Sequence, residues 1–366
     1  MSQDSVLISA PVATENAERG AAESALNWLE RLVIPVGAIL VGFAIFAVFL
    51  LIVTDAKPLA VFESIYRAGF GSWFSVQKTL IRAAPLLLTA LCVAIPAQLG
   101  LIIIGAEGAL VMGGLAAAVT GFQLNGAGPM FVIFAMALAG MSAGGFWIAI
   151  SGALKHYRGV NETISSLLLT YIAIALLNHA VSGPLRDPES LNKPATPPIG
   201  DINMLGNLPG MNVHAGLLFG IIACMIAAFM IYRTVPGFAM RVIGGNVRAA
   251  QLAGLAVGQI TLAACFCAGA AAGLAGMVEV AAVQGSASAA INAGYGYTGI
   301  LIAFIARQNP IAVIPAALLL AGIGAASGLL QRSHGLPDAT VLVIQGIIFL
   351  TILASETLYG RRRTST

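Results

Sequence analysis

The sequence predicts an all-α polytopic membrane protein, a bundle of about ten spans that includes short or broken helices. Three observations favour this fold class. Of the 366 residues, 58% are hydrophobic and 9% are charged, against about 25% charged in an ordinary soluble domain. The mean hydropathy is +0.92. Long uncharged runs recur along the chain, and they must be helical because lipid offers the backbone no hydrogen-bond partner.

The chain opens with a polar segment of mixed charge, residues 1–31, which precedes a first apolar run at residues 32–54. A secretory signal peptide has a basic start and a shorter apolar core, so we expect this run to be retained as the first membrane span. Residues 1–31 then form a polar N-terminal tail on the cytoplasmic side.

The predicted transmembrane domain covers residues 32–358. A helix needs about 20 apolar residues to cross a bilayer, and the run at 296–306 is too short to cross alone. The amphipathic stretch 57–82 is expected to lie along the outer interface. The predicted spans are residues 32–54, 79–97, 100–121, 130–154, 161–182, 214–232, 259–283, 296–306, 310–330 and 338–358.

Lys and Arg residues indicate the orientation. With both termini in the cytoplasm, eleven of the 18 Lys and Arg residues fall inside and seven outside, as the positive-inside rule favours. Residues 359–366 are then a basic cytoplasmic tail. The proline-rich segment 183–213 lies outside the cell and cannot be a regular helix. It is either a docking surface for an external partner or a plain connector.

A literal G-x-G-x-x-G pattern begins at Gly294 and ends at Gly299. A nucleotide-binding loop of this kind follows a strand and precedes an acidic residue by about 20 positions. Neither condition is met here, and no P-loop motif occurs in the chain, so we expect no nucleotide cofactor. Glycines that interrupt a short apolar run indicate a transport site or close helix packing.

Several other classes are disfavoured. The net charge of +3 is too small for a nucleic-acid surface. All four cysteines lie in apolar runs, and Cys265 and Cys267 lack a second Cys or His pair at zinc-like spacing, so no metal site is expected.

Two carboxylates interrupt apolar runs, Glu107 and Glu279. A charge at the centre of a span costs roughly 2.5–3.5 kcal/mol and usually faces a cavity or a partner. With Gln284, Tyr295 and Tyr297, they form the predicted translocation pathway. The alternatives are that Glu107 caps a broken helix, that the tyrosines lie at the membrane interface, or that the two carboxylates couple transport to ions.

The cytoplasmic segment 235–257 carries the most specific pattern. Pro236-Gly237 are expected to end the preceding helix, and Gly244-Gly245 to form a turn. Asn246 is a good N-cap for a short helix at about 247–255. A short helix with a face of small residues can insert into a groove on a partner.

This segment resembles the coupling-helix region of ABC importer permeases of the nucleoside and simple-sugar branch, in the superfamily that also serves branched-chain amino acids and ribose. The family pattern has a proline where this chain has Val247. The resemblance implies an ATPase-coupling role for Arg241, Gly244, Gly245, Asn246, Arg248, Ala249, Ala250, Ala253 and Gly254.

Three further stretches, 102–110, 159–173 and 294–310, resemble the same family in the same order, so the resemblance covers about residues 75–358. Ile103, Ala109 and Thr170 replace polar residues of the family pattern. These replacements leave the cargo open.

The resemblance implies a multi-pass permease subunit in the inner membrane, which is not itself an enzyme. It would pair with a second copy or a homologous chain, dock separate ABC ATPase subunits, and receive a nucleoside or simple sugar from an extracytoplasmic substrate-binding protein. Two alternatives remain from the residues themselves: an ion-coupled secondary transporter that uses Glu107 and Glu279, and a membrane scaffold without transport.

Overall fold

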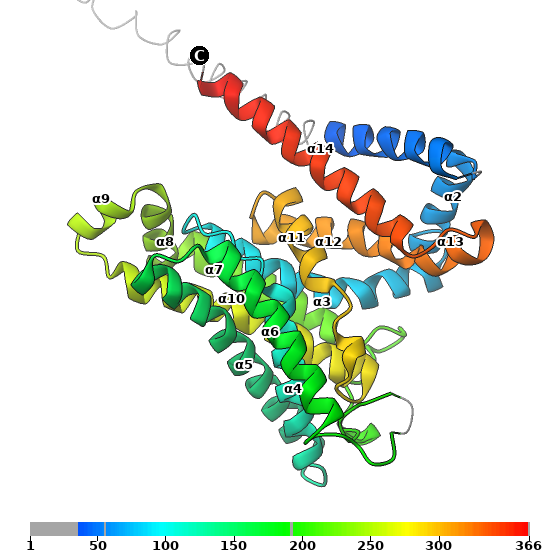
Figure 1. The fold of residues 1–366 in the computed structure, drawn as a ribbon, viewed down its shortest axis with the longest axis horizontal. Coiled ribbons are helices and arrows are strands. Elements are labelled where there is room, and N and C mark those ends of the chain that lie inside the picture. Colours follow the sequence, from blue (N-terminus) through cyan, green and yellow to red (C-terminus); the bar gives the residue numbers. More distant parts are fainter. Residues whose placement is uncertain (1–35, 55, 191–192, 365–366) are drawn as a thin grey trace, which may run out of the picture. The chain divides into compact units, whose positions relative to one another are not determined.

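The computed structural model describes residues 36–54, 56–190 and 193–364 (Figure 1). Within these ranges the fold is all-α, as predicted, and the β pairing consists of two isolated bridges. The α-helices are Val36–Val53, α2 (Pro58–Gly69), α3 (Trp73–Ala97), α4 (Ala106–Gln123), α5 (Pro129–Arg158), α6 (Glu162–Ser182), α7 (Gly216–Arg233), α8 (Val235–Gly245), α9 (Val247–Leu252), α10 (Val257–Glu279), α11 (Tyr295–Ile305), α12 (Pro310–Ala325), α13 (Ser327–His334) and α14 (Ala339–Thr364).

Seven of the described helical segments are long and apolar enough to cross a membrane. They are Val36–Val53, Trp73–Ala97, Pro129–Arg158, Glu162–Ser182, Gly216–Arg233, Val257–Gln284 and Pro310–His334. The other three predicted spans correspond to α4, to the short α11, and to an apolar helix at Ala339–Ser355. The prediction of a polytopic bundle with some short helices is therefore confirmed.

Two boundaries differ from the expectation. α3 begins at Trp73, so the second half of the stretch predicted to lie along the interface forms the first turns of a span. Ser72 makes this start possible, because its hydroxyl accepts a hydrogen bond from the amide of Ser75 at 3.1 Å. At the C-terminus, α14 continues through residues 359–364, where a tail was expected; arginine is a good helix former. The predicted tail at 1–31 and residues 365–366 lie outside the described residues.

The chain forms two compact units. The first consists of the helix Val36–Val53 and the described part of α14 from Gly346 onward. Phe46 and Leu50 are fully buried there. A Cβ atom on Gly42 would lie 3.2 Å from the Cα of Ile348, so the two helices approach closely at this glycine.

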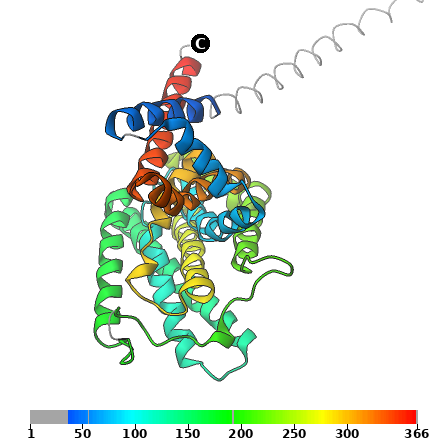
Figure 2. The ribbon, with the colours of Figure 1, turned by 90° about the vertical axis from the view of Figure 1, so that its right-hand side faces the viewer.

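The second unit, residues Ala56–Gln345, is built around α10. α10 packs against α3, α4 and α5, and Figure 2 shows it, in yellow, in the middle of the unit with the green α6 along one edge. The contact depends on glycines. A Cβ on Gly273 would overlap the carbonyl of Gly140 and lie 3.1 Å from the Cα of Gly144, and a Cβ on Gly113 would overlap the backbone of Gly273. Small residues of this kind let membrane helices approach closely.

Candidate functional site

The glycine motif opens α11, and a side chain of this protein occupies its anion site. Gly294 is the N-cap, with φ of 80°. The backbone N–H groups of Gly294 and Gly296 donate to the two carboxylate oxygens of Glu107, at 2.8 and 2.5 Å. The first N–H groups of a helix have no partner within the helix, and they attract negative charge. Glu107 is fully buried, and it supplies that charge from 187 residues away.

Glu107 therefore caps a helix, but not its own. It lies in the first turn of α4, whose N-cap residue is Gly105 and therefore has no side chain that could cap the helix. The approach to α11 is close, since a Cβ on Gly296 would overlap the backbone of Glu107.

The contact between Glu107 and the start of α11 lies partway along the bundle, between the ends of its helices. The amide of Ile104 donates to the hydroxyl of Ser166 at 3.0 Å, so residues 101–104, which form no helix, lie beside the first turns of α6. A Cβ on Gly108 would lie 2.8 Å from the Cα of Thr170, which is about 12 Å along α6 from its first residue. α11, with 11 residues, is about 16 Å long, half of the roughly 30 Å hydrocarbon core.

Glu279 is the last residue of α10, and it is only 3% exposed. The chain then widens into a π-helical turn, Val280–Gln284, that ends at Gly285 with φ of 69°. Nε2 of Gln284 donates to Oε1 of Glu279 at 3.3 Å. π-helical turns are rare and occur frequently at functional sites. The structure thus brings two of the predicted pathway residues into contact.

Tyr295 and Tyr297 point in different directions. Tyr295 lines a cavity of about 310 Å³ between α3, α11, α12, α13 and the start of α14, and its hydroxyl interacts electrostatically with Glu107 and Glu279. Tyr297 is 36% exposed and is not part of this cavity lining. Tyr295, Glu107 and Glu279 therefore form one neighbourhood, together with Gln284 through its bond to Glu279.

Five polar residues of the cavity are missing from the predicted pathway: Arg82, Thr298, Ser327, Asp338 and Gln345. Arg82 is the last residue of the amphipathic stretch 57–82, which the sequence predicts to lie along the outer interface. Gln345, at 5% exposure, is the only amide side chain in the last apolar run, residues 338–358. That isolated polar residue was the available signal in the sequence.

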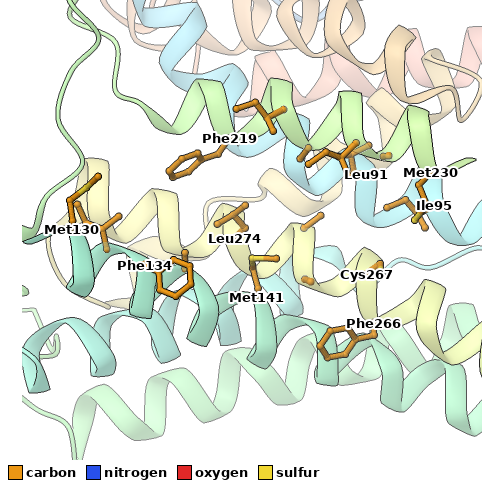
Figure 3. Close-up of a pocket in the computed structure, with 18 residues that line it drawn as sticks. Leu91, Ile95, Met130, Phe134, Met141, Phe219, Met230, Phe266, Cys267 and Leu274 are labelled. Carbon is orange, nitrogen blue, oxygen red and sulfur yellow. The ribbon is translucent and has the colours of Figure 1, made fainter. Parts of the chain in front are cut away.

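A larger cavity of about 610 Å³ lies between α3, α5, α7 and α10. Figure 3 shows apolar side chains along it, among them Leu91, Phe134, Met141 and Phe219. Its lining side chains offer only weak hydrogen-bonding groups, the thiol of Cys267 and the thioether sulfurs of Met130, Met141 and Met230. A hydroxyl buried without a partner is costly, so this groove is unsuited to a polar solute.

The coupling-helix segment has the predicted cap. Oδ1 of Asn246 accepts a hydrogen bond from the amide of Ala249 at 3.0 Å. Two details differ from the expectation. The helix ends at Leu252, because Gly254 takes a φ of 78°. Pro236-Gly237 open α8 instead of ending α7, because proline fits the first turn of a helix, where its missing N–H is not needed.

Gly244-Gly245 form the last turn of α8, and the chain turns one residue later, at Asn246. The guanidinium of Arg241 donates to the carbonyl of Ile231 on α7, so Arg241 holds α8 in place. In α9, Ala250 is buried, whereas Leu252 is 91% exposed. The exposed members of the predicted coupling set are Arg241, Gly244, Gly245, Asn246, Arg248, Ala249, Ala253 and Gly254.

α8 touches a turn that follows α11, through Gln98. A Cβ on Gly244 would overlap the carbonyl of Gln98, and Nε2 of Gln98 donates to the carbonyl of Gln308 at 3.2 Å. Arg307 and Gln308 have φ of 49° and 60°, a left-handed backbone that few residues other than glycine adopt. Gln98 therefore connects the predicted coupling segment to the turn that follows α11.

The segment 183–213 is irregular in its described residues, as predicted, and it lies against the stretch after Glu279. The amide of Leu205 donates to the carbonyl of Ala281 at 2.7 Å. The amide of Thr196 donates to the carbonyl of Ala287 at 2.9 Å, and the hydroxyl of Thr196 accepts from the amide of Ala287 at 3.0 Å. The loop is therefore bonded to the backbone that leads from the π-helical turn to α11.

Comparison with known proteins adds a family match. A family described as branched-chain amino acid transport system / permease component matches residues 75–353. The chain is 33% identical over 334 residues to the glucose ABC transporter permease protein TsgB13 of Haloferax volcanii, which covers 88% of this chain and 87% of that protein.

Two further relatives are similar over most of their length. The guanosine ABC transporter permease protein NupP of Bacillus subtilis is 30% identical over 344 residues, covering 89% of this chain and 94% of that protein. The nucleoside ABC transporter permease protein NupB of Lactococcus lactis is 25% identical over 334 residues, covering 88% and 91%.

Proposed function

The chain belongs to the family of branched-chain amino acid transport system permease components, and from this premise we propose how its described parts divide the work of transport. It is a multi-pass membrane permease subunit of an ABC importer for a nucleoside or a sugar, and it is not an enzyme. The observation that carries the proposal is the coupling-helix segment, whose capped helix α9 stands exposed beside α8.

ATPase subunits dock on this segment. The exposed small residues in and just after α9, Ala249, Ala253 and Gly254, let the backbone of a partner groove approach closely. Arg248 is exposed beside them. Both termini lie in the cytoplasm with this segment, and the membrane is the inner membrane. A second copy or a homologous chain completes the transport path.

Motion of the docked ATPases reaches the pathway through α11. The coupling segment presses on Gln98, which holds the carbonyl of Gln308 at the end of α11. The other end of α11 is held by Glu107 and carries Tyr295 toward the cavity. α11 is thus a half-span helix between the docking surface and the pathway, a common arrangement in transporters.

The outer face uses the loop 183–213. An extracytoplasmic binding protein that docks there can act on the stretch after Glu279, because the loop donates backbone hydrogen bonds to it. Glu107, Glu279, Gln284 and Tyr295 border the pathway. Tyr297 lies on a different side of α11 and takes a lesser part.

The ion-coupled alternative has lost its main support. Both carboxylate oxygens of Glu107 already accept backbone N–H groups, and members of this family are driven by ATPases. The scaffold alternative fails on the family assignment itself.

The docking surface is tested by co-purification of the permease with its ATPase. Arg248→Glu reverses an exposed charge on α9, and Arg186→Glu makes the same change on the exposed loop 183–213. We expect Arg248→Glu to lose the ATPase and uptake while the permease still folds, and Arg186→Glu to keep the ATPase. Normal assembly and uptake with Arg248→Glu would overturn the coupling assignment.

A further inference from the structure

We propose that the cavity beside Tyr295 binds the sugar ring of the cargo, a neutral furanose or pyranose, and reads its hydroxyl groups through Arg82, Asp338 and Gln345. This inference rests on the proposed function, since it names the part of the cargo that the permease recognises. It assigns the recognition to residues that the pathway prediction did not include.

The lining of the cavity combines charged, amide, hydroxyl and aromatic groups from distant parts of the chain. Its polar members are Arg82, Tyr295, Thr298, Ser327, Asp338 and Gln345. Arg82 and Asp338 are exposed, whereas Gln345 is buried. The cavity therefore has charges at its mouth and an amide at its floor.

Arg82 and Asp338 do not form an ion pair with each other. Among the described residues, the ion pairs are Arg67–Glu63 and Lys155–Glu162, and neither involves Arg82 or Asp338. Arg82 donates one hydrogen bond, from Nη1 to the carbonyl of Gly324 at 2.8 Å, and a guanidinium has five N–H donors. Opposite charges that line one cavity without pairing leave room for a bridging polar ligand.

The chemistry of the lining selects the ligand class. One cation and one anion line the cavity, and the carboxyl group of Glu279 also interacts electrostatically with Arg82. The site therefore has no excess of positive charge, which favours a neutral solute over an anion. A carboxylate accepts hydrogen bonds from two hydroxyl groups, a guanidinium donates to hydroxyl oxygens, and an amide does both. The ring of Tyr295 adds an apolar face with a polar tip. Vicinal hydroxyls on a sugar ring, together with the apolar C–H face of that ring, satisfy all of these groups together.

The size agrees with a single ring. The cavity of about 310 Å³ lies at the low end of the roughly 300–1,000 Å³ found for ligand sites. Gly324 keeps the space open: a Cβ placed there would lie 3.5 Å from Nη1 of Arg82 and 3.9 Å from Nε2 of Gln345. A larger side chain at this position would project between the two groups.

Protection of a cysteine tests binding directly. Ser327→Cys places a thiol in the cavity lining, and the native Cys267, in the apolar groove, serves as an internal control. The permease–ATPase complex in nanodiscs is labelled with a water-soluble thiol reagent, and mass spectrometry follows each site. We expect adenosine, ribose or glucose to slow labelling at position 327 and to leave Cys267 unchanged. We expect 2′,3′-dideoxyadenosine, which lacks the vicinal hydroxyls, to protect at least about tenfold more weakly.

Transport variants give the second readout. Asp338→Asn, Arg82→Gln and the cavity-filling Gly324→Leu are compared with Gly324→Ala, which keeps the space. We expect the first three to raise the KM for uptake about tenfold or more with the ATPase still bound, and Gly324→Ala to behave as the native protein. The native complex must import one of the three solutes, and failure to do so would overturn the proposed function. Import by the native complex, together with no protection at position 327 and unchanged KM in the variants, would overturn this inference alone.

Discussion

Glu107→Gln is the sharpest perturbation of the site, because it changes charge with almost no change in shape. The carboxylate accepts from Gly294 at 2.8 Å and from Gly296 at 2.5 Å, and it is fully buried. A glutamine keeps one acceptor oxygen and turns an NH₂ donor toward the other N–H group. One bond is lost, one donor is left facing a donor, and the charge at the start of α11 disappears.

The size of the effect follows from these losses. A hydrogen bond to a charged group contributes about 1.5–3 kcal/mol, and a buried charge at a helix end contributes up to ~2 kcal/mol. The expected destabilisation is therefore about 2–5 kcal/mol, a large share of the roughly 5–15 kcal/mol that holds a protein folded. At about 2 °C per kcal/mol for a large domain, the unfolding temperature should fall by ~4–10 °C.

Buried cysteines make the measurement possible. Cys92, Cys224 and Cys265 are buried, so a dye that fluoresces on reaction with thiols reports their exposure as the purified permease is heated. The control is Glu63→Gln, which breaks an exposed pair with Arg67 and should change the unfolding temperature little. If Glu107→Gln unfolds at the native temperature, the carboxylate does not hold α11 and the reasoning fails.

Three further predictions concern packing, coupling and pH. Gly273→Ala should prevent the folded permease from accumulating, because its Cβ would overlap the carbonyl of another helix; size-exclusion profiles compared with Gly346→Ala, where the space is open, check this. Gly244→Val should push on Gln98 and reduce uptake per ATP hydrolysed while the ATPase stays bound, and an unchanged ratio would contradict the proposed route through α11. Burial holds the pKa of His214, which precedes α7, below its usual value. The folded state therefore favours the neutral imidazole, and its stability falls as the pH drops through about 6.5. The native protein should lose more thermal stability than His214→Gln between about pH 7.5 and 5.5, and equal losses in the two proteins would refute this prediction.

Much of the architecture could be predicted from local patterns. Long apolar runs mark the spans, since a bilayer demands helices of a certain length. Asn246 marks a helix start, and its side chain accepts the expected backbone hydrogen bond. The predicted coupling segment stands out for the same reason: a cap, two glycines and a helix with small residues lie within a short stretch of sequence. Each of these signals depends on neighbours along the chain.

The partners within the site could not be predicted in this way. The glycine motif marks the start of α11, but the side chain that accepts hydrogen bonds from its N–H groups, Glu107, lies 187 residues away. The sequence could not distinguish a cap on α4 from a cap on α11. Arg82 lies on α3, whereas Asp338 and Gln345 lie at the start of the last apolar run, and only the packing of these distant helices brings them to one cavity. Local sequence specifies which backbone groups a helix leaves unpaired, whereas the group that meets them depends on how distant helices pack.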